Sequence, residues 1–220
     1  MIVQIYEVRS PDEGRKVAEL GADHIGALFG KGKHEYALDA DEIKEIFIAL
    51  PKRVKKVVLV LEWNEKEIEE LLEKTCPNIL HIGTSPEFPT AENVRAFKKR
   101  HPEMLIMRTI PVTDESSIAL AKEYEGIADF ILLDSKKKNS AQIGATGEIH
   151  DWDISKKLVE SVHVPIILAG GLGPENVAEA VRKVNPAGVD SKTKTDTADG
   201  TRKDLDKIRQ FVTNAHLRVQ

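Results

Sequence analysis

One aspartate follows directly on a fully apolar run and has the chemistry needed for proton transfer. Residues 130–133 are Phe, Ile, Leu and Leu, and Asp134 comes next. A carboxyl group that is partly withdrawn from water has a raised pKa and can act as a general acid or base near neutral pH. Asp134 is therefore a candidate catalytic residue, although an aspartate in this place could also fix a loop or cap a helix.

Two later segments could together bind a phosphate group. Gly170 and Gly171 allow the backbone to approach a ligand closely, and Pro174 sets the first turn of a helix, whose free N–H groups bind anions. The segment 190–195 adds ammonium and hydroxyl groups. A structural glycine turn followed by a solvated charged loop is the alternative. The candidate phosphate-binding residues are Gly170, Gly171, Ser191, Lys192, Thr193 and Lys194.

The elements that must position these residues alternate along the whole chain. The candidate strands are residues 2–8, 24–29, 55–61, 78–82, 104–110, 129–134, 164–169 and 188–190. The candidate helices begin near residues 11, 39, 65, 91, 115, 153, 174 and 204. Nearly continuous apolar strands are typical of parallel sheets that are covered on both faces. The alternation in a chain of 220 residues predicts an α/β protein with one (β/α)8 barrel domain over residues 1–220.

A (β/α)8 barrel forms its active site at the carboxyl ends of its strands, so polar residues there carry most weight. His81 and Arg108 could orient or polarise a sugar hydroxyl or carbonyl group, although His81 could equally be a structural histidine. The longest irregular segment, residues 135–151, follows the sixth strand, where a lid over the active site would lie. The polar residues at predicted strand ends are Glu7, His81, Arg108, Asp134 and Asp190.

Composition argues against several classes of function. The chain has 32 Lys and Arg against 36 Asp and Glu, a net charge of −4, and no basic block that would bind nucleic acid. No apolar stretch approaches the ~20 residues of a membrane span. The single cysteine, Cys76, suits the reducing cytoplasm. With no dinucleotide fingerprint and no zinc-spaced ligand cluster, we expect no cofactor and no metal, and the oligomeric state stays open.

The chain resembles the phosphoribosylanthranilate isomerase family over essentially its whole length. The resemblance implies an Amadori rearrangement, in which a general acid protonates the ring oxygen of an aminoribofuranose phosphate and a general base removes the C2 proton. It also implies that Asp134 is the acid and that the glycine pair and the 190–195 loop bind phosphate. The segments that carry the resemblance are residues 21–26, 132–135, 144–147, 151–152, 169–176 and 188–190.

The sequence departs from the family pattern at two places that matter for chemistry. The family's base is the cysteine of a Lys-x-Cys-Gly stretch, where this chain has Tyr6 and Glu7. Tyr6 has the better position and Glu7 the better pKa, and strand alternation allows only one of them to face the pocket squarely. The family's Arg-Tyr pair, whose arginine holds the anthranilate carboxylate, is Glu35-Tyr36 here. In a partly desolvated pocket this change would turn attraction into repulsion.

These observations favour an isomerase that acts on a phosphorylated sugar related to, but different from, phosphoribosylanthranilate. The predicted catalytic residues are Asp134, Tyr6 and Glu7, and the predicted substrate-binding residues are Glu35, His81 and Arg108. The expected partner is a small phosphorylated metabolite. One alternative is a true phosphoribosylanthranilate isomerase of tryptophan biosynthesis with a replaced base. A second is a binding protein for phosphorylated metabolites that has no catalytic activity.

Overall fold

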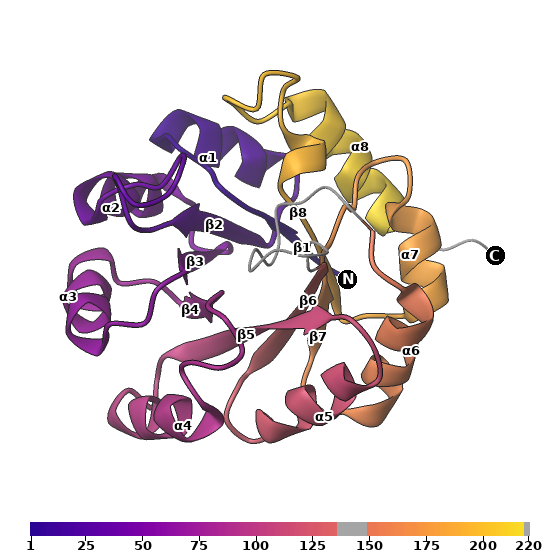
Figure 1. Cartoon of the computed structure of the whole chain (residues 1–220). Coiled ribbons are helices and arrows are strands. Elements are labelled where there is room, and N and C mark those ends of the chain that lie inside the picture. Colours follow the sequence, from indigo (N-terminus) through magenta and orange to yellow (C-terminus); the bar gives the residue numbers. More distant parts are fainter. Residues whose placement is uncertain (136–148, 218–220) are drawn as a thin grey trace.

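Strands and helices alternate throughout the structure, a computed structural model that describes residues 1–135 and 149–217 (Figure 1). The strands are β1 (Ile2–Ile5), β2 (His24–Leu28), β3 (Lys55–Val60), β4 (Ile79–Ile82), β5 (Leu105–Val112), β6 (Phe130–Ser135), β7 (Ile166–Leu168) and β8 (Gly188–Ser191). The helices are α1 (Pro11–Glu19), α2 (Ala40–Ala49), α3 (Glu65–Thr75), α4 (Ala91–Arg100), α5 (Ser116–Glu123), α6 (Trp152–Ser161), α7 (Val177–Val184) and α8 (Leu205–Ala215). A 3-10 helix, η1 (Thr193–Thr195), follows β8.

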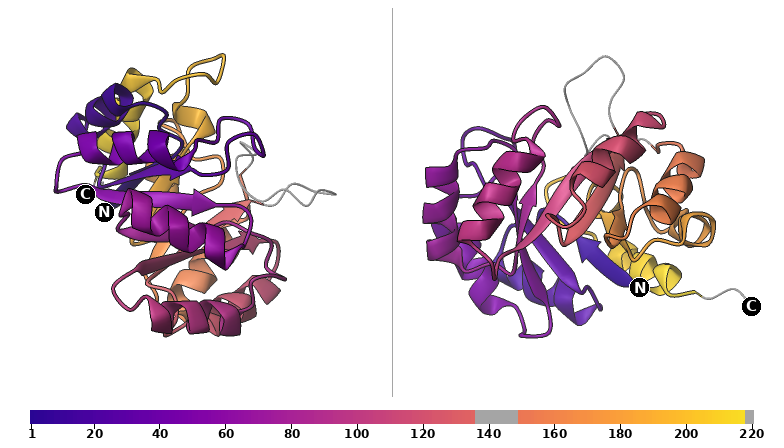
Figure 2. Two further views of the ribbon diagram at one scale, coloured as in Figure 1. Left: turned by 90° about the vertical axis from the view of Figure 1, so that its left-hand side faces the viewer. Right: turned by 90° about the horizontal axis from the view of Figure 1, so that it is seen from below.

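All strands run parallel and form a closed barrel in chain order, with the helices around it (Figures 1 and 2). The barrel closes where β1 pairs with β8, so that Gln4 lies beside Asp190 on one side and beside His24 on the other. The predicted (β/α)8 barrel is therefore confirmed. Among the described residues, no helix is both long and apolar enough to cross a membrane.

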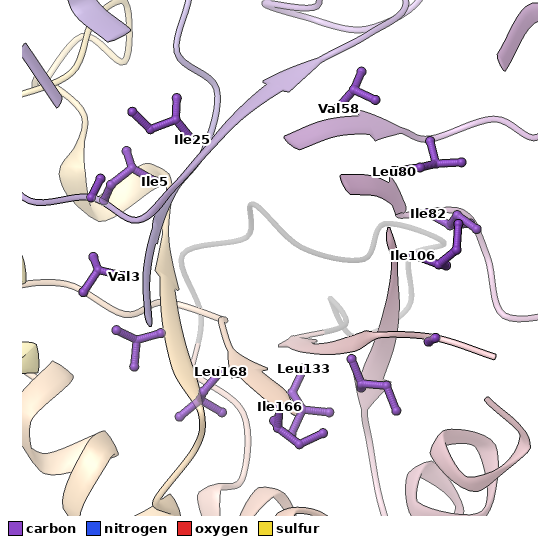
Figure 3. Packing of buried hydrophobic residues seen from close by; sticks show 14 of the residues in the cluster. Val3, Ile5, Ile25, Val58, Leu80, Ile82, Ile106, Leu133, Ile166 and Leu168 are labelled. Carbon is purple, nitrogen blue, oxygen red and sulfur yellow. The ribbon is translucent and has the colours of Figure 1, made fainter. Parts of the chain in front are cut away.

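Side chains along each strand alternate between the two sides of the barrel wall. Val3, Ile5, Leu133 and Leu168 point outward and pack beneath the helices (Figure 3). The residues of opposite parity form a separate cluster inside the barrel: Tyr6, Val57, Ile79, Met107, Leu132, Ile167 and Ala169. This parity decides which side chains can reach the cavity at the top of the barrel.

Local sequence signals set most helix ends. The Ser10 side chain accepts a hydrogen bond from the backbone N–H of Glu13 at 3.2 Å, as expected of an N-cap before Pro11. The first helix ends before Gly21, whose φ of +104° is favourable only for glycine. The predicted start of α7 near residue 174 was wrong. The amide oxygen of Asn176 accepts a hydrogen bond from the backbone N–H of Gly173 at 2.8 Å, and residues 174–176 form a turn ahead of the helix.

Candidate active site

A cavity at the carboxyl ends of the strands brings together most of the predicted site residues. It also includes Asp190, which begins the loop predicted to bind phosphate, Thr109, which the sequence analysis did not single out, and an apolar side formed by Leu28, Leu59 and Leu61. The predicted residues that line the cavity are Tyr6, Glu7, His81, Asp134, Gly170, Gly171, Ser191, Lys192, Thr193 and Lys194. The predicted lid falls mainly on residues 136–148, which lie outside the described residues.

Asp134 lies at the inner side of β6, two positions after the inward-facing Leu132. Burial raises the pKa of this carboxyl group to about 7, although hydrogen bonds from Ser135 lower it in part. A carboxyl group with this pKa is protonated in about half of the protein molecules at pH 7 and can still release its proton. Asp134 therefore has the property that a general acid needs.

Asp190 is a second buried carboxyl group in the cavity. Gln4 Nε2 donates a hydrogen bond to its Oδ1 at 3.2 Å, and Gln4 Oε1 lies 3.0 Å from His24 Nδ1 inside the barrel. Burial, and then the charge of Asp134, raise the pKa of Asp190 well above the ordinary aspartate value. The sequence placed Asp190 at a strand end and at the start of the 190–195 loop that we predicted to bind phosphate.

Tyr6 follows the last residue of β1, faces the inside of the barrel, and is connected through His81 to Thr109. Its hydroxyl group forms a short hydrogen bond with His81 Nδ1, and His81 Nε2 lies 2.6 Å from Thr109 Oγ1. Burial raises the pKa of Tyr6 well above 10 and lowers the pKa of His81 to about 3. The imidazole of His81 and the phenol of Tyr6 are therefore both neutral at pH 7, and this hydrogen-bonded pair carries no charge.

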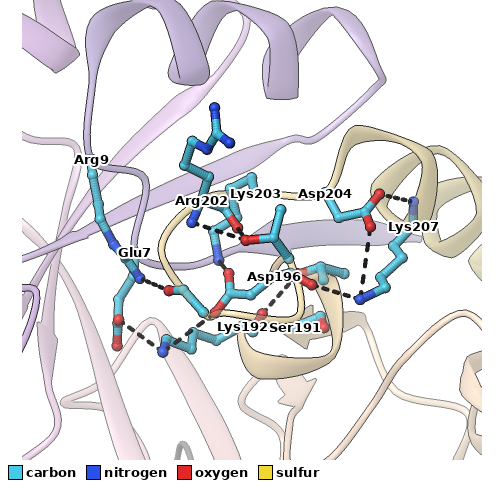
Figure 4. A network of polar contacts seen from close by, with 12 residues as sticks. Glu7, Arg9, Ser191, Lys192, Asp196, Arg202, Lys203, Asp204 and Lys207 are labelled. Atoms are coloured by element: carbon cyan, nitrogen blue, oxygen red, sulfur yellow. Dashed lines mark hydrogen bonds and ion pairs between the residues drawn. The ribbon is translucent and has the colours of Figure 1, made fainter.

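Glu7 also lines the cavity, contrary to the expectation that only one of Tyr6 and Glu7 would do so. Strand β1 ends at Ile5, and Glu7 has a φ of +58°, a left-handed conformation that is uncommon for residues other than glycine. The chain therefore leaves the strand alternation just before Glu7. The Glu7 carboxylate is buried, and its Oε2 lies 3.2 Å from Lys192 Nζ (Figure 4).

The two loops predicted to bind phosphate adjoin each other at the edge of the cavity. Gly170 and Gly171 have φ values of +80° and +64°, which side-chain-bearing residues rarely adopt. Asn176 Nδ2 donates a hydrogen bond to the carbonyl oxygen of Gly171 at 3.0 Å, and Ser191 Oγ donates to that of Leu172 at 2.7 Å. These bonds hold the glycine turn against the loop that carries Lys192. The binding of phosphate here stays a prediction.

Arg108 lies outside the cavity, against the prediction that it binds substrate. It faces the outer side of β5, as Ile106 does, and it is fully buried. Its guanidinium group donates hydrogen bonds to the carbonyl oxygens of Ile82 and Thr84, both at 3.0 Å, and lies 5.4 Å from the ring centre of Tyr124. Because backbone carbonyls use these donors, Arg108 holds the connection between β4 and α4.

Glu35 is exposed in the connection between β2 and α2, and it does not line the cavity. Its hydrogen bond to Tyr36 raises the pKa of the Tyr36 phenol, and the guanidinium carbon of Arg9 lies 3.7 Å from the centre of that ring. The carboxylate of Glu35 therefore does not form part of the cavity wall. The repulsion expected between Glu35 and an aromatic acid has no basis in this geometry.

Gly26 on β2 makes room for the Tyr6 ring, since a Cβ atom at this position would overlap the ring. We expect Gly26→Ala to displace the ring, break the Tyr6–His81 hydrogen bond and lower the free energy of unfolding by about 1–3 kcal/mol. Chemical denaturation measures this loss. In a Tyr6→Ala background the same substitution should cost much less, and an equal cost in both backgrounds would contradict the explanation.

The closed barrel, with carboxyl groups and paired glycines around a cavity at the carboxyl ends of its strands, has the arrangement typical of (β/α)8-barrel enzymes. The family model for N-(5'-phosphoribosyl)anthranilate (PRA) isomerase matches residues 90–214. A PRA isomerase from Methanocella arvoryzae is 34% identical, with 96% of this chain and 95% of the relative covered. The chain therefore belongs to the PRA isomerase family.

Other relatives and solved structures point to the same family. A PRA isomerase from Methanosarcina acetivorans is 32% identical over 96% of this chain and 91% of its own length. The crystal structure of the Thermotoga maritima enzyme matches with a TM-score of 0.83 at 25% identity, with 98% of each chain covered. Another structure of this family, which matches at 24% identity, is a complex with reduced 1-(o-carboxyphenylamino)-1-deoxyribulose 5-phosphate.

These comparisons confirm the predicted isomerase and correct the expected substrate. We expected a phosphorylated sugar other than phosphoribosylanthranilate, because Tyr6 and Glu35 replace residues of the family pattern. Relatives that are at least 30% identical over nearly the full length are named as PRA isomerases, which overturns that expectation in favour of a true PRA isomerase.

Proposed function

We propose that this protein catalyses the Amadori rearrangement of N-(5'-phosphoribosyl)anthranilate in tryptophan biosynthesis. The observation that carries the proposal is the Asp134 carboxyl group, whose pKa of about 7 lies in the range of a general acid, in the same cavity as the paired glycines 170 and 171. The apolar side of the cavity, formed by Leu28, Leu59 and Leu61, suits the aromatic ring of the substrate.

In the first step, protonated Asp134 gives its proton to the ring oxygen of the aminoribofuranose. The C1–O bond breaks, and the lone pair of the anilino nitrogen forms a C1=N iminium group. In the second step, a base takes the C2 proton. The C2–H electron pair forms a C1=C2 bond, and the π pair of the iminium returns to nitrogen. The resulting enol becomes the ketone when the C1=C2 pair takes up a proton at C1 and the hydroxyl group on C2 loses its proton to form C2=O.

We assign the base to Glu7. The phenol of Tyr6 keeps its proton because burial raises its pKa well above 10, and its hydrogen-bond partner His81 has a pKa of only about 3. Tyr6 therefore does not take up the C2 proton, whereas Glu7 places a carboxylate in the cavity, where its Oε2 is ion-paired with Lys192 Nζ at 3.2 Å.

Under this assignment, Glu7→Gln should lower kcat by about 10²-fold, because general base catalysis typically contributes 10²–10⁴-fold. Tyr6→Phe should retain most of kcat, since the ring remains and only the hydroxyl group is lost. Steady-state kinetics of the two variants compare the roles. A loss in Tyr6→Phe that matches or exceeds the loss in Glu7→Gln would move the base to Tyr6.

The pH dependence should reveal Asp134. Its pKa is about 7, so the protonated acid form is depleted as the pH rises above this value. We expect kcat/KM, which reports the free enzyme, to fall about tenfold for each pH unit above about 7. A pH profile of kcat/KM measures this limb. Constant activity up to pH 9 would show that protonated Asp134 is not required.

The function itself is tested by turnover of phosphoribosylanthranilate and by complementation of a strain that lacks this isomerase. Purified protein should consume the substrate, and the gene should restore growth without tryptophan. Soluble expression without growth and without turnover would refute the proposal. Under the proposal the partner is a small phosphorylated metabolite and the enzyme works in the cytoplasm, where the exposed thiol of Cys76 stays reduced.

A further inference from the structure

Lys192 holds the carboxylate that we assign as the base. Its ammonium group lies 3.2 Å from Glu7 Oε2 and 3.4 Å from Asp196 Oδ2 (Figure 4). It also lies 5.3 Å from the ring centre of Tyr36. The side chain of Glu7 is 10% exposed and that of Lys192 is 18% exposed. One cation is therefore shared between two carboxylates at the wall of the cavity.

The two carboxylates depend on Lys192 to different degrees. Asp196 has a second partner, because Lys203 Nζ lies 2.5 Å from its Oδ1 and the Lys203 side chain is almost completely buried. Among the described residues, Lys192 is the only cation within ion-pair distance of Glu7. If Lys192 moved away, Asp196 would stay paired, but Glu7 would become an unpaired carboxylate.

A phosphate group near Gly170 and Gly171 would compete for the same ammonium. Lys192, Thr193 and Lys194 line the cavity together with these glycines. A phosphate dianion carries twice the charge of a carboxylate, so at a similar distance it attracts the ammonium more strongly. A carboxylate that loses its cationic partner in a buried place binds a proton more tightly and becomes a better base.

We propose that Lys192 couples phosphate binding to catalysis: it neutralises Glu7 in the free enzyme and turns to the substrate phosphate on binding, which releases Glu7 to take the C2 proton. This inference rests on the proposed function. It gives Lys192, the residue after β8, a part in catalysis as well as in phosphate binding. Binding energy from the phosphate, which does not react, thereby supports the chemical step.

The kinetic test uses a substrate analogue that lacks the phosphate group. Added inorganic phosphate should raise turnover of this analogue at least tenfold in the wild type, whereas in Lys192→Met the activation should disappear. Lys192→Arg, which keeps the charge, should restore part of it. No activation in a wild type that converts the complete substrate, or equal activation in Lys192→Met, would overturn the coupling.

A binding test is independent of turnover. Calorimetry with inorganic phosphate compares the wild type, Glu7→Gln, Lys192→Met and the double variant. Glu7→Gln should tighten binding about fivefold or more when Lys192 is present, and clearly less in the Lys192→Met background. Additive effects would overturn the proposal.

Glu175→Gln is the matched control, because Glu175 pairs with Lys194 of the same loop, at 3.9 Å, but is exposed. It should change phosphate affinity less than twofold, and tightening equal to that of Glu7→Gln would also overturn the coupling. If the wild type does not convert phosphoribosylanthranilate at all, the proposed function fails, while the binding test still decides whether Lys192 links Glu7 to phosphate.

Discussion

Asp134→Asn is expected to lower kcat by about 10²–10⁴-fold, the range that a positioned general acid contributes. The asparagine has nearly the same shape but cannot donate a proton to the ring oxygen. Phosphate binding should change little, since the substitution leaves the Gly170–Gly171 turn and the 190–195 loop unaffected. Steady-state kinetics with phosphoribosylanthranilate, together with calorimetry of inorganic phosphate, measure both quantities.

Protein stability provides the control for this variant. Burial raises the pKa of Asp134 from 3.8 to about 7, so the folded chain holds the proton more tightly than the unfolded chain does. Between these pH values the unfolded state loses its proton first, and stability falls as the pH rises toward 7. Asparagine does not ionise, so at pH 8 the variant should melt at the same or a higher temperature. If it loses activity and also melts well below the wild type, unfolding rather than acid chemistry explains the loss.

The strand pattern predicted the barrel because each strand is a short apolar run between clear breaks. Asp134 follows the inward-facing Leu132 by two positions, and its side chain lines the cavity as this spacing predicts. The same counting would have excluded Arg108, which shares its parity with the outward-facing Ile106. Strand parity alone therefore separates a cavity carboxyl group from a buried structural arginine.

Other features depend on contacts that no local pattern contains. Glu7 lies beyond the last residue of β1, and its left-handed backbone conformation breaks the alternation from which we argued. Its partner Lys192 comes from the opposite end of the chain and meets it only because β1 pairs with β8 to close the barrel. The turn at residues 174–176 is held in part by the Asn176 side chain, which bonds to the backbone of Gly171 and Gly173, and the apparent helix start at Pro174 concealed it.

Asp196→Asn is expected to be the most destabilising of the substitutions considered. It leaves the ammonium of Lys203, whose side chain is 1% exposed, without its carboxylate partner at 2.5 Å. Burial already lowers the pKa of Lys203, and the charge of Asp196 opposes that effect. Breaking one side of a buried ion pair typically costs about 3–5 kcal/mol. For a chain of this size the melting temperature should fall by roughly 6–20 °C.

The double variant Asp196→Asn/Lys203→Met decides whether the unpaired charge causes this loss. With both charges removed, the penalty for burying an isolated ammonium disappears, so the double variant should be more stable than Asp196→Asn alone. Glu115→Gln, which breaks the exposed pair with Lys157, should leave the melting temperature almost unchanged. If the double variant is less stable than the single one, Asp196 acts mainly through its other contacts in the loop after β8.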